Sequence, residues 1–449
     1  MIKDLTEGNP QSLLWRFTIP MFISVIFQQM YNIADSVIAG KFAGEEALAA
    51  VGASYPITMI FMAIAVGSNI GCSVVISRLF GAKRYRQMKT AIYTILVSAM
   101  VMSVILMLAG LAGSRGLMRM IRTPENIFAA GDLYLRIYIG GFLFLYLYNV
   151  STGIFTSLGD SKTPLYFLIG SSLGNIVLDY WFVAGLHWGV AGVAWATFLA
   201  QGVACVLALI TMLFRLRTVE TDGKPEIFSS EMLKQVSMIA VPSILQQSFI
   251  SVGNIFVQGV VNSFGSSVIA GYSGAIKLNG FAVTSFTTLG NGVSSFTAQN
   301  IGAGKVDRVK EGMKGGARMC ILLTVPFVIV YVGFAGSVMS LFMKEESAMA
   351  MNTGVAFLRI TSPFFLLVAL KLASDGVLRG TGSMKEFMVA TFTDLILRVV
   401  LAFVLSVPFG TIGVWMSWPI GWVVGMTLSL YFNRKVMKRL EWSQQEAEK

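Results

Sequence analysis

Twelve apolar stretches run through the sequence, most of them long enough to cross a lipid bilayer as a helix. They centre on residues 13–39, 47–78, 90–113, 130–156, 163–186, 189–214, 234–262, 268–299, 316–342, 350–378, 386–408 and 411–433. About 20 apolar residues span the hydrocarbon core as a helix, and lipid requires every backbone polar group to be paired internally. Charged residues make up only 13% of the chain, against about 25% in soluble proteins. We therefore expect an all-α integral membrane protein with twelve transmembrane helices.

The positive charges predict the orientation of these helices. With the N-terminus inside, the cytoplasmic segments hold 24 Lys and Arg residues and the outer loops hold five. Cytoplasmic loops are enriched in Lys and Arg, so we expect a multi-pass protein of the cell membrane with both termini in the cytoplasm. This placement accounts for most of the net charge of +11 without a nucleic-acid partner, and none is expected.

Catalytic and metal-binding side chains are scarce. The chain has a single histidine, His187, at a predicted outer turn, and the cysteines Cys72, Cys205 and Cys320 lie far apart within apolar stretches. These spacings match neither a metal-ligand motif nor a disulfide framework. We expect no enzymatic activity and no cofactor.

The two halves of the sequence resemble each other. Residues 19–54 align with 241–276, so that Pro20 meets Pro242 at an offset of 222. Further along, YLRI (134–137) meets FLRI (357–360), and GVAGVAW (189–195) meets GTIGVWM (410–416). A repeat of six spans enters the membrane with the same orientation twice, as in transporters with parallel repeats. We expect two six-helix lobes related by a pseudo-twofold axis along the membrane normal. Their predicted bounds are 1–214 and 235–435, with a cytoplasmic linker at 215–234 and a tail at 436–449.

Polar side chains in the first half form one candidate cation site. They are Asp35 on the first span, Asn175 and Asp179 one helical turn apart on the fifth, and Thr197 on the sixth. Gln28 and Asn32 lie in the same polar stripe as Asp35 and are candidate cleft or substrate contacts, as are Asn149, Thr152, Gln247, Asn254 and Gln258. Buried ionisable residues are costly and need a reason. Carboxylate, amide and hydroxyl oxygens suit Na⁺, and neighbouring carboxylates can share a proton. The alternative is that Asp35, Asn175 and Thr197 only form polar contacts between helices.

The second half carries a different set. Its first span repeats the polar stripe as Gln247, Ser251, Asn254 and Gln258, without a carboxylate, and Val257 replaces Asp35. Arg398 and Ala402 stand where the first half has Asn175 and Asp179. The spacing of Lys371 with Asp375, and of Asp394 with Arg398, predicts two structural ion pairs. Lys277 has no partner nearby in the sequence. We therefore place the cation site in the N-terminal lobe.

The chain resembles the multidrug and toxic compound extrusion (MATE) family over about residues 10–435. The resemblance rests on the repeat and span count, on YNIADSVIAGKFAGEEALAAVG after a proline-containing first helix, and on LGDSKTP after the fourth helix. It implies a secondary antiporter that exports small organic cations by alternating access, driven by H⁺ or Na⁺. It also implies a cation site at Asp35, Asn175, Asp179 and Thr197, a first-helix kink at Pro20, and an accessory role for Asn149 or Thr152.

Within the family, the seventh span carries Gln246 and Gln247 where the NorM branch has an acid. This favours a DinF-like branch. The alternative function is a lipid-linked oligosaccharide flippase of the same superfamily, whose members usually have fourteen spans and a cationic cavity. We expect a lipid-embedded monomer.

Overall fold

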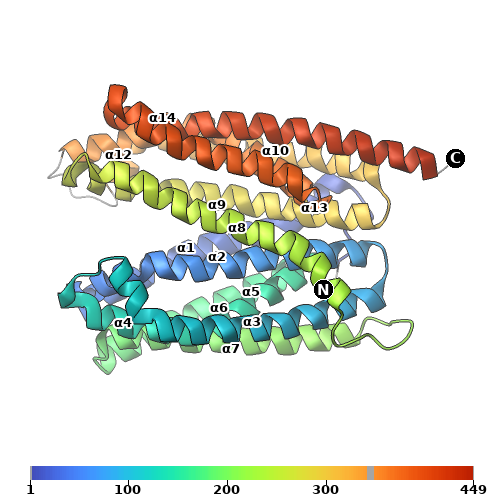
Figure 1. Ribbon diagram of the computed structural model, residues 1–449, viewed down its shortest axis with the longest axis horizontal. Coiled ribbons are helices and arrows are strands. Elements are labelled where there is room, and N and C mark those ends of the chain that lie inside the picture. The colour runs from blue at the N-terminus through green and yellow to red at the C-terminus, as the bar shows by residue number, and fades with distance from the viewer. Residues whose placement is uncertain (1–2, 341–347, 448–449) are drawn as a thin grey trace. The chain divides into compact units, whose positions relative to one another are not determined.

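The computed structural model describes residues 3–340 and 348–447, and every regular element in these ranges is a helix (Figure 1). The chain divides into two compact units. Unit 1 comprises residues 1–4 and 19–248, and unit 2 comprises residues 5–18 and 249–449. The fold class is the expected all-helical one.

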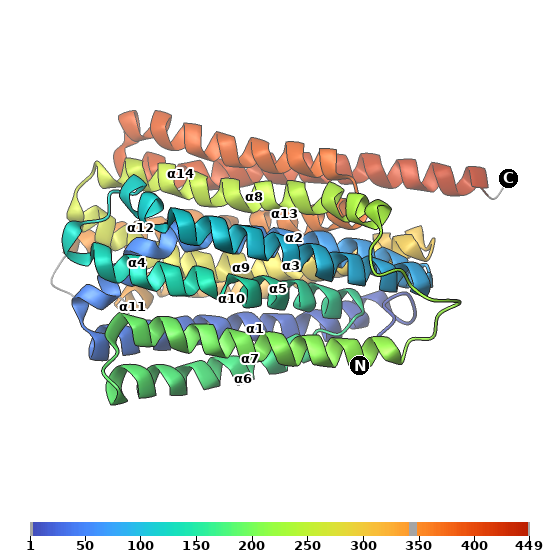
Figure 2. The same cartoon turned by 60° about the horizontal axis from the view of Figure 1, so that its bottom comes forward.

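Unit 1 holds seven α-helices, two short π-helices and the start of an eighth α-helix. These are α1 (Pro10–Ile38, from residue 19 on), η1 (Ala39–Ala43), α2 (Glu45–Gly81), α3 (Tyr85–Met120), α4 (Glu125–Gly140), α5 (Phe142–Ser157), α6 (Lys162–Asp179), η2 (Tyr180–Gly185), α7 (Gly189–Arg217) and α8 (Ser230–Asn262, up to residue 248). Helix α2 packs on α4 and α5, and α6 lies along α7, as Figure 2 shows.

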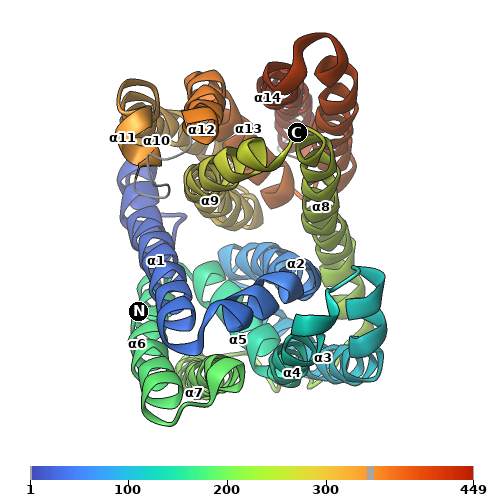
Figure 3. The ribbon, with the colours of Figure 1, turned by 90° about the vertical axis from the view of Figure 1, so that its left-hand side faces the viewer.

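Unit 2 repeats this plan. It contains the start of α1, the rest of α8, and then α9 (Ser266–Gly302), α10 (Val306–Gly333), α11 (Ala335–Met339), α12 (Ala348–Thr361), η3 (Ser362–Phe364), α13 (Phe365–Gly380) and α14 (Met384–Ala447). Helix α9 packs on α12 and α13 as α2 packs on α4 and α5, and α10, α11 and α12 lie together (Figure 3).

The turns of the two units also repeat. Gly44 and Gly265 precede α2 and α9 with φ of 92° and 95°, and each of these helices has 37 residues. Such backbone angles favour glycine, which lacks the Cβ that clashes there. The turn before the last span repeats too, with Gly189 at φ 55° in unit 1 and Gly410 at φ 58° in unit 2. The structure therefore carries the duplication that the sequence indicates.

Within the described residues the twelve predicted stretches fall on helices, with local differences, and residues 341–342 of the stretch at 316–342 lie outside the described residues. Nine described helices are long and apolar enough to cross a membrane, and the pair α4 and α5, bent by 47°, would make ten. One of the nine is α14, which Gly410 divides into two helices with its non-helical backbone. Helix α9 is not among them because its polar residues lower its hydropathy. The stretches at 130–156 and 350–378 were each expected to be one helix, but each is broken, at Gly141 and at Ser362–Phe364.

The segment between α7 and α8 packs against α3 of the same unit. The backbone N–H groups of Glu226 and Ser229 donate to the Thr90 and Thr94 hydroxyls at 3.0 and 2.9 Å. The Arg86 side chain donates to the Lys224 carbonyl at 3.1 Å. The predicted linker is thus held along part of its length by unit 1, whereas the lobe bounds expected from the sequence stay a prediction.

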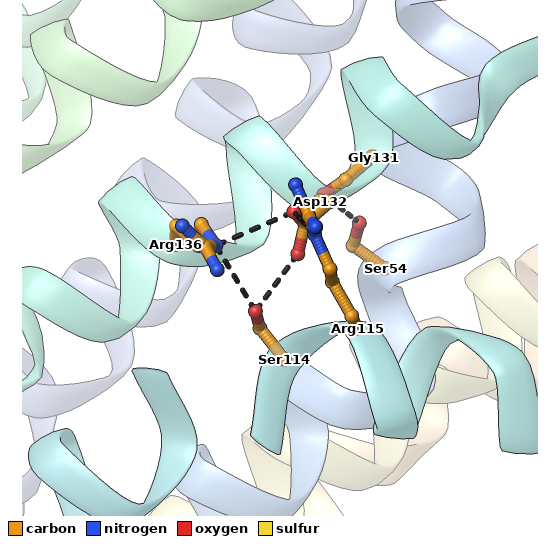
Figure 4. Close-up of polar contacts among 6 residues, drawn as sticks. All are labelled: Ser54, Ser114, Arg115, Gly131, Asp132 and Arg136. Atoms are coloured by element: carbon orange, nitrogen blue, oxygen red, sulfur yellow. Dashed lines mark hydrogen bonds and ion pairs between the residues drawn. The ribbon is translucent and has the colours of Figure 1, made fainter. Parts of the chain in front are cut away.

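An ionic cluster fixes the corner between α3 and α4 (Figure 4). Asp132 Oδ1 accepts a hydrogen bond from Ser114 Oγ at 2.8 Å, and Oδ2 lies 3.3 Å from the Nε atoms of both Arg115 and Arg136. Both arginines are largely exposed, so this cluster serves the packing of the corner rather than a buried site.

Candidate cation-coupling site

The predicted polar residues of the first half come from three helices of unit 1. Asp35 lies near the end of α1, Asn175 and Asp179 lie in the last turn of α6, and Thr197 lies in α7. Asp179 is fully buried and Asn175 is 2% exposed. Since α6 runs along α7, residues one turn apart on α6 can both face α7.

The Asn175 amide connects Asp179 to Thr197. In one orientation its nitrogen lies 3.3 Å from Thr197 Oγ1. The flipped orientation pairs both ends, because the nitrogen then donates to Asp179 Oδ2 while the oxygen accepts from the Thr197 backbone N–H at 3.1 Å. Amide orientation follows from the hydrogen-bond network, and the flipped one fits it better. The Thr197 hydroxyl itself donates to the Val193 carbonyl at 3.1 Å.

The side chains of Asp35 and Asp179 lie within hydrogen-bonding reach of each other. Each keeps one buried Oδ1 atom without a hydrogen-bond partner. Two carboxylates cannot both be ionised at such a contact unless something positive lies between them. The arrangement can therefore hold a shared proton, or a small cation with oxygen ligands.

Two tyrosines of the site, Tyr31 and Tyr134, were not predicted from the sequence. The Tyr31 hydroxyl hydrogen-bonds to the Thr197 side chain, and Tyr31 and Tyr134 both lie close enough to interact electrostatically with Asp35 and Asp179. Tyr31 precedes Asp35 by one helical turn, and this spacing could have placed it on the same face of the helix. Tyr134 comes from α4, and only the fold brings it to the site.

A small cavity adjoins the site. Its volume is about 20 Å³, enough for a single water molecule, and its lining includes Tyr134, Tyr138, Thr197 and Gln201. The buried Gln201 Oε1 atom lacks a hydrogen-bond partner. A water there could bond to these polar groups and would extend the hydrogen-bond network beyond Thr197.

The other polar residues predicted in the first half have different surroundings. Gln28 and Asn32 are exposed on α1. Asn69 Nδ2 donates to the Asn149 carbonyl at 2.8 Å and to the Thr152 hydroxyl at 2.9 Å, which ties α2 to α5. Asn149 and Thr152 thus have a packing role in this structure.

In the second half, the polar stripe continues on α8. Gln247 is half-buried, Gln258 Nε2 donates to Asn262 Oδ1 at 2.8 Å, and the half-buried Asn254 has an unpartnered Oδ1 atom. Lys277 is exposed on α9.

The predicted ion pairs are arranged differently from the expected scheme. Lys371 Nζ lies 2.8 Å from Asp375 Oδ2, as the spacing on α13 suggests. Asp394, on α14, lies 3.5 Å from the same Lys371 Nζ atom. Within the described residues no ion pair joins Asp394 to Arg398, whose guanidinium instead lies over the Trp418 ring, 4.3 Å from its centroid.

Pro20 lies inside α1, next to the division between the two units at Thr18 and Ile19. Proline removes one helical hydrogen bond and favours a kink. The Ser24 hydroxyl donates to the Pro20 carbonyl at 2.9 Å, a contact that also promotes bending.

Comparisons with known proteins identify the family. The MatE family model matches residues 20–181 and again 242–404, two matches that begin 222 residues apart, as in the internal repeat. The chain is 26% identical over 97% of its length to the probable multidrug resistance protein YoeA of Bacillus subtilis, covering 96% of that protein. It is 27% identical over 94% of its length to YpnP of the same organism, also named a probable multidrug resistance protein, covering 93% of it.

A solved structure agrees with this assignment. An outward-facing multidrug resistance MATE transporter of the MOP superfamily superposes with a TM-score of 0.91 and 25% identity, covering 97% of this chain and 98% of that one. The chain therefore belongs to the MatE family and is a multi-pass membrane transporter.

Proposed function

We propose that this transporter exports small organic cations, including drugs, in exchange for H⁺ or Na⁺. The observation that carries the proposal is the contact between the Asp35 and Asp179 side chains in a unit of apolar helices. Intramembrane carboxylates mark ion and proton pathways. The names of the bacterial relatives support drug efflux.

Loading and emptying of the site change its charge, which is what couples it to a cationic substrate. A proton or Na⁺ bound between Asp35 and Asp179 neutralises negative charge that would otherwise attract an organic cation. The amide of Asn175 and the hydroxyls of Tyr31 and Thr197 supply the remaining polar partners. Because coupling is reciprocal, the driving ion and the drug each lower the affinity for the other.

The proposed cycle has four steps. The driving ion binds from outside and releases the drug there. The lobes then rearrange by alternating access, aided by bending of α1 near Pro20. The ion leaves to the cytoplasm, and a new drug molecule binds. The coupling ion is either H⁺ or Na⁺, and the DinF-like branch remains our proposal for the subfamily.

Dye efflux from proteoliposomes tests this function. Wild type should move an organic cation such as ethidium under one imposed gradient, either of Na⁺ or of pH, which identifies the driving ion. Asp35→Asn should reduce gradient-driven efflux about tenfold or more, within the range of typical coupling energies. Asp132→Asn is the matched control, because it makes the same chemical change at the α3–α4 corner of the same unit.

Two results would contradict the proposal. Efflux by Asp35→Asn at the wild-type rate would remove the site from the mechanism. Absence of cation transport under either gradient, with movement of a lipid-linked oligosaccharide instead, would favour the flippase function.

We also propose that the chain works as a monomer in the cell membrane with both termini in the cytoplasm. Single cysteines introduced near each terminus should react with a membrane-impermeant thiol reagent only after the cells are opened. The native Cys72, Cys205 and Cys320 are buried, so they give a low background.

A further inference from the structure

Unit 2 contains a buried ionic cluster that the proposed coupling site does not use. It comprises Lys371, Asp375 and Arg379 on α13 and Asp394 and Arg398 on α14, each 6% exposed or less. Three of these side chains are cationic and two are anionic, so the cluster carries an excess positive charge. Buried charges need hydrogen-bond or ionic partners. The three cationic side chains of this cluster have different numbers of such partners.

Asp375 and Lys371 form a buried ion pair. Asp375 Oδ2 accepts from Lys371 Nζ at 2.8 Å, and Asp375 Oδ1 accepts from the Ser429 hydroxyl at 2.6 Å. Asp394 also lies on Lys371, through Oδ2 at 3.5 Å. Arg379 has its own neighbours, since it donates to Asn291 Oδ1 at 3.0 Å and lies over the Phe387 ring.

Two glycines of α14, Gly421 and Gly425, lie against the Asp394 and Lys371 side chains. A Cβ atom at Gly425 would lie 2.6 Å from Lys371 Cε and 3.0 Å from Asp394 Cβ, and one at Gly421 would lie 2.7 Å from Asp394 Oδ1. A larger residue at either position would require the Lys371 or Asp394 side chain to shift. Asp394 is therefore drawn toward Lys371, although Arg398 lies one turn away on its own helix.

Arg398 is left with unused donors. Its Nε and Nη2 atoms are buried and have no hydrogen-bond partner. The indole nitrogens of Trp415 and Trp418 are also buried without a partner. The guanidinium is held over Trp418 at 4.3 Å, with Tyr272 near enough to interact electrostatically. Unsatisfied buried donors are costly, and a bound acceptor would satisfy them.

The position of Arg398 in the repeat strengthens this reasoning. At the offset of 223 Arg398 corresponds to Asn175, and at the offset of 221 Trp418 corresponds to Thr197. The contact between Arg398 and Trp418 thus replaces the contact between Asn175 and Thr197. Val257, which is fully buried, replaces Asp35. The same place in the fold carries two carboxyl groups in unit 1 and a guanidinium in unit 2.

We propose that Arg398 and Trp418 form a binding site for the carboxylate or phosphate of a small organic anion. The planar guanidinium matches both groups through paired N–H donors, and the Trp418 ring beneath it packs with Phe357 and Trp415 in one aromatic cluster. This adds a second class of ligand to the proposed cation export. Binding at this site does not depend on that export.

Ligand binding to the full chain in detergent, without any gradient, tests the site. Benzoate and phenyl phosphate are the probes, followed by calorimetry and by tryptophan fluorescence. We expect saturable binding that Arg398→Gln weakens about tenfold or more, and that Arg398→Lys restores only in part because lysine lacks the paired donors. Lys277→Gln is the matched control, an exposed cation of the same unit, and should bind as wild type.

The fluorescence readout separates binding from a structural effect. Trp418→Phe removes the indole under the guanidinium, so it should lose much of the fluorescence change on probe binding and bind the probes more weakly in the calorimeter. Equal affinity of wild type and Arg398→Gln for both probes, or absence of binding to wild type, would overturn the proposal. Binding of phosphatidylglycerol in nanodiscs, but of neither soluble probe, would assign the site to a lipid headgroup and overturn it as well.

Because these measurements use no gradient, they are independent of the export assay. If cation efflux is absent but the anion probes bind, the export proposal fails and the anion site stands. If cation efflux is present but the anion probes do not bind, the anion site fails and the export proposal stands.

Discussion

Removing the Lys371 ammonium should destabilise unit 2 strongly. Lys371 is 3% exposed and lies within 3.5 Å of both Asp375 and Asp394. In Lys371→Met the methylene stem is largely kept, but two buried carboxylates lose their shared cation. Breaking a buried pair by deleting one partner costs about 3–5 kcal/mol. For a unit of this size each kcal/mol corresponds to roughly 2–4 °C, so the melting temperature should fall by roughly 6–20 °C.

Thermal unfolding of the purified chain in detergent measures this change. Lys277→Met is the control, since that lysine is exposed on α9 and should change stability by less than about 0.5 kcal/mol. Adding Asp375→Asn and Asp394→Asn to Lys371→Met removes the uncompensated negative charge and should recover much of the loss. A melting temperature of Lys371→Met equal to that of wild type would refute the reasoning, and so would a failure of the combined variant to recover.

Three further predictions follow from contacts elsewhere in the chain. Gly376→Ala should destabilise unit 2, because the new Cβ would lie 2.2 Å from the Gly290 carbonyl oxygen; urea or thermal unfolding would show a loss of about 1–3 kcal/mol, and an unchanged midpoint would contradict the contact. Asp160→Ala removes a buried carboxylate that accepts two backbone N–H bonds at the start of α6 and pairs with Arg215; it should cost more than the roughly 1–2 kcal/mol of a helix cap alone, measured in the same way. Tyr31→Phe deletes the hydroxyl bonded to Thr197 and should lower gradient-driven efflux without changing the amount of folded protein; full efflux would place Tyr31 outside the mechanism.

The helices of this chain are predictable from its apolar stretches because lipid leaves the backbone few alternatives. The breaks inside them are less predictable. Pro363 signals the interruption at Ser362–Phe364, since proline cannot continue a helical hydrogen-bond ladder. Gly141 gives no comparable signal, because its φ of −81° is one that any residue adopts. The bend between α4 and α5 therefore depends on tertiary packing.

The candidate site was only partly accessible from the sequence. Helical spacing places Asn175 and Asp179 on one face, and the same rule could have placed Tyr31 beside Asp35. Spacing cannot bring α1, α4, α6 and α7 together, so neither the carboxyl contact nor the role of Tyr134 follows from it. The close approach of Asp35 to Asp179 is a property of the fold.

The charged residues of unit 2 show the limit of local spacing in another way. The i,i+4 spacing brings two side chains near each other on one helix, but a partner across the helix interface can compete for either of them. Lys371 attracts both Asp375 and Asp394, because Gly421 and Gly425 remove the side chains that would keep α14 away. Asp394 still interacts electrostatically with Arg398, but within the described residues no ion pair joins the two, and the guanidinium lies over Trp418. A duplicated fold has thus kept its helices and turns while Val257 and Ala402 stand in place of Asp35 and Asp179 and Arg398 stands in place of Asn175. That change in charged residues, rather than any difference in architecture, is what separates the chemistry of the two units.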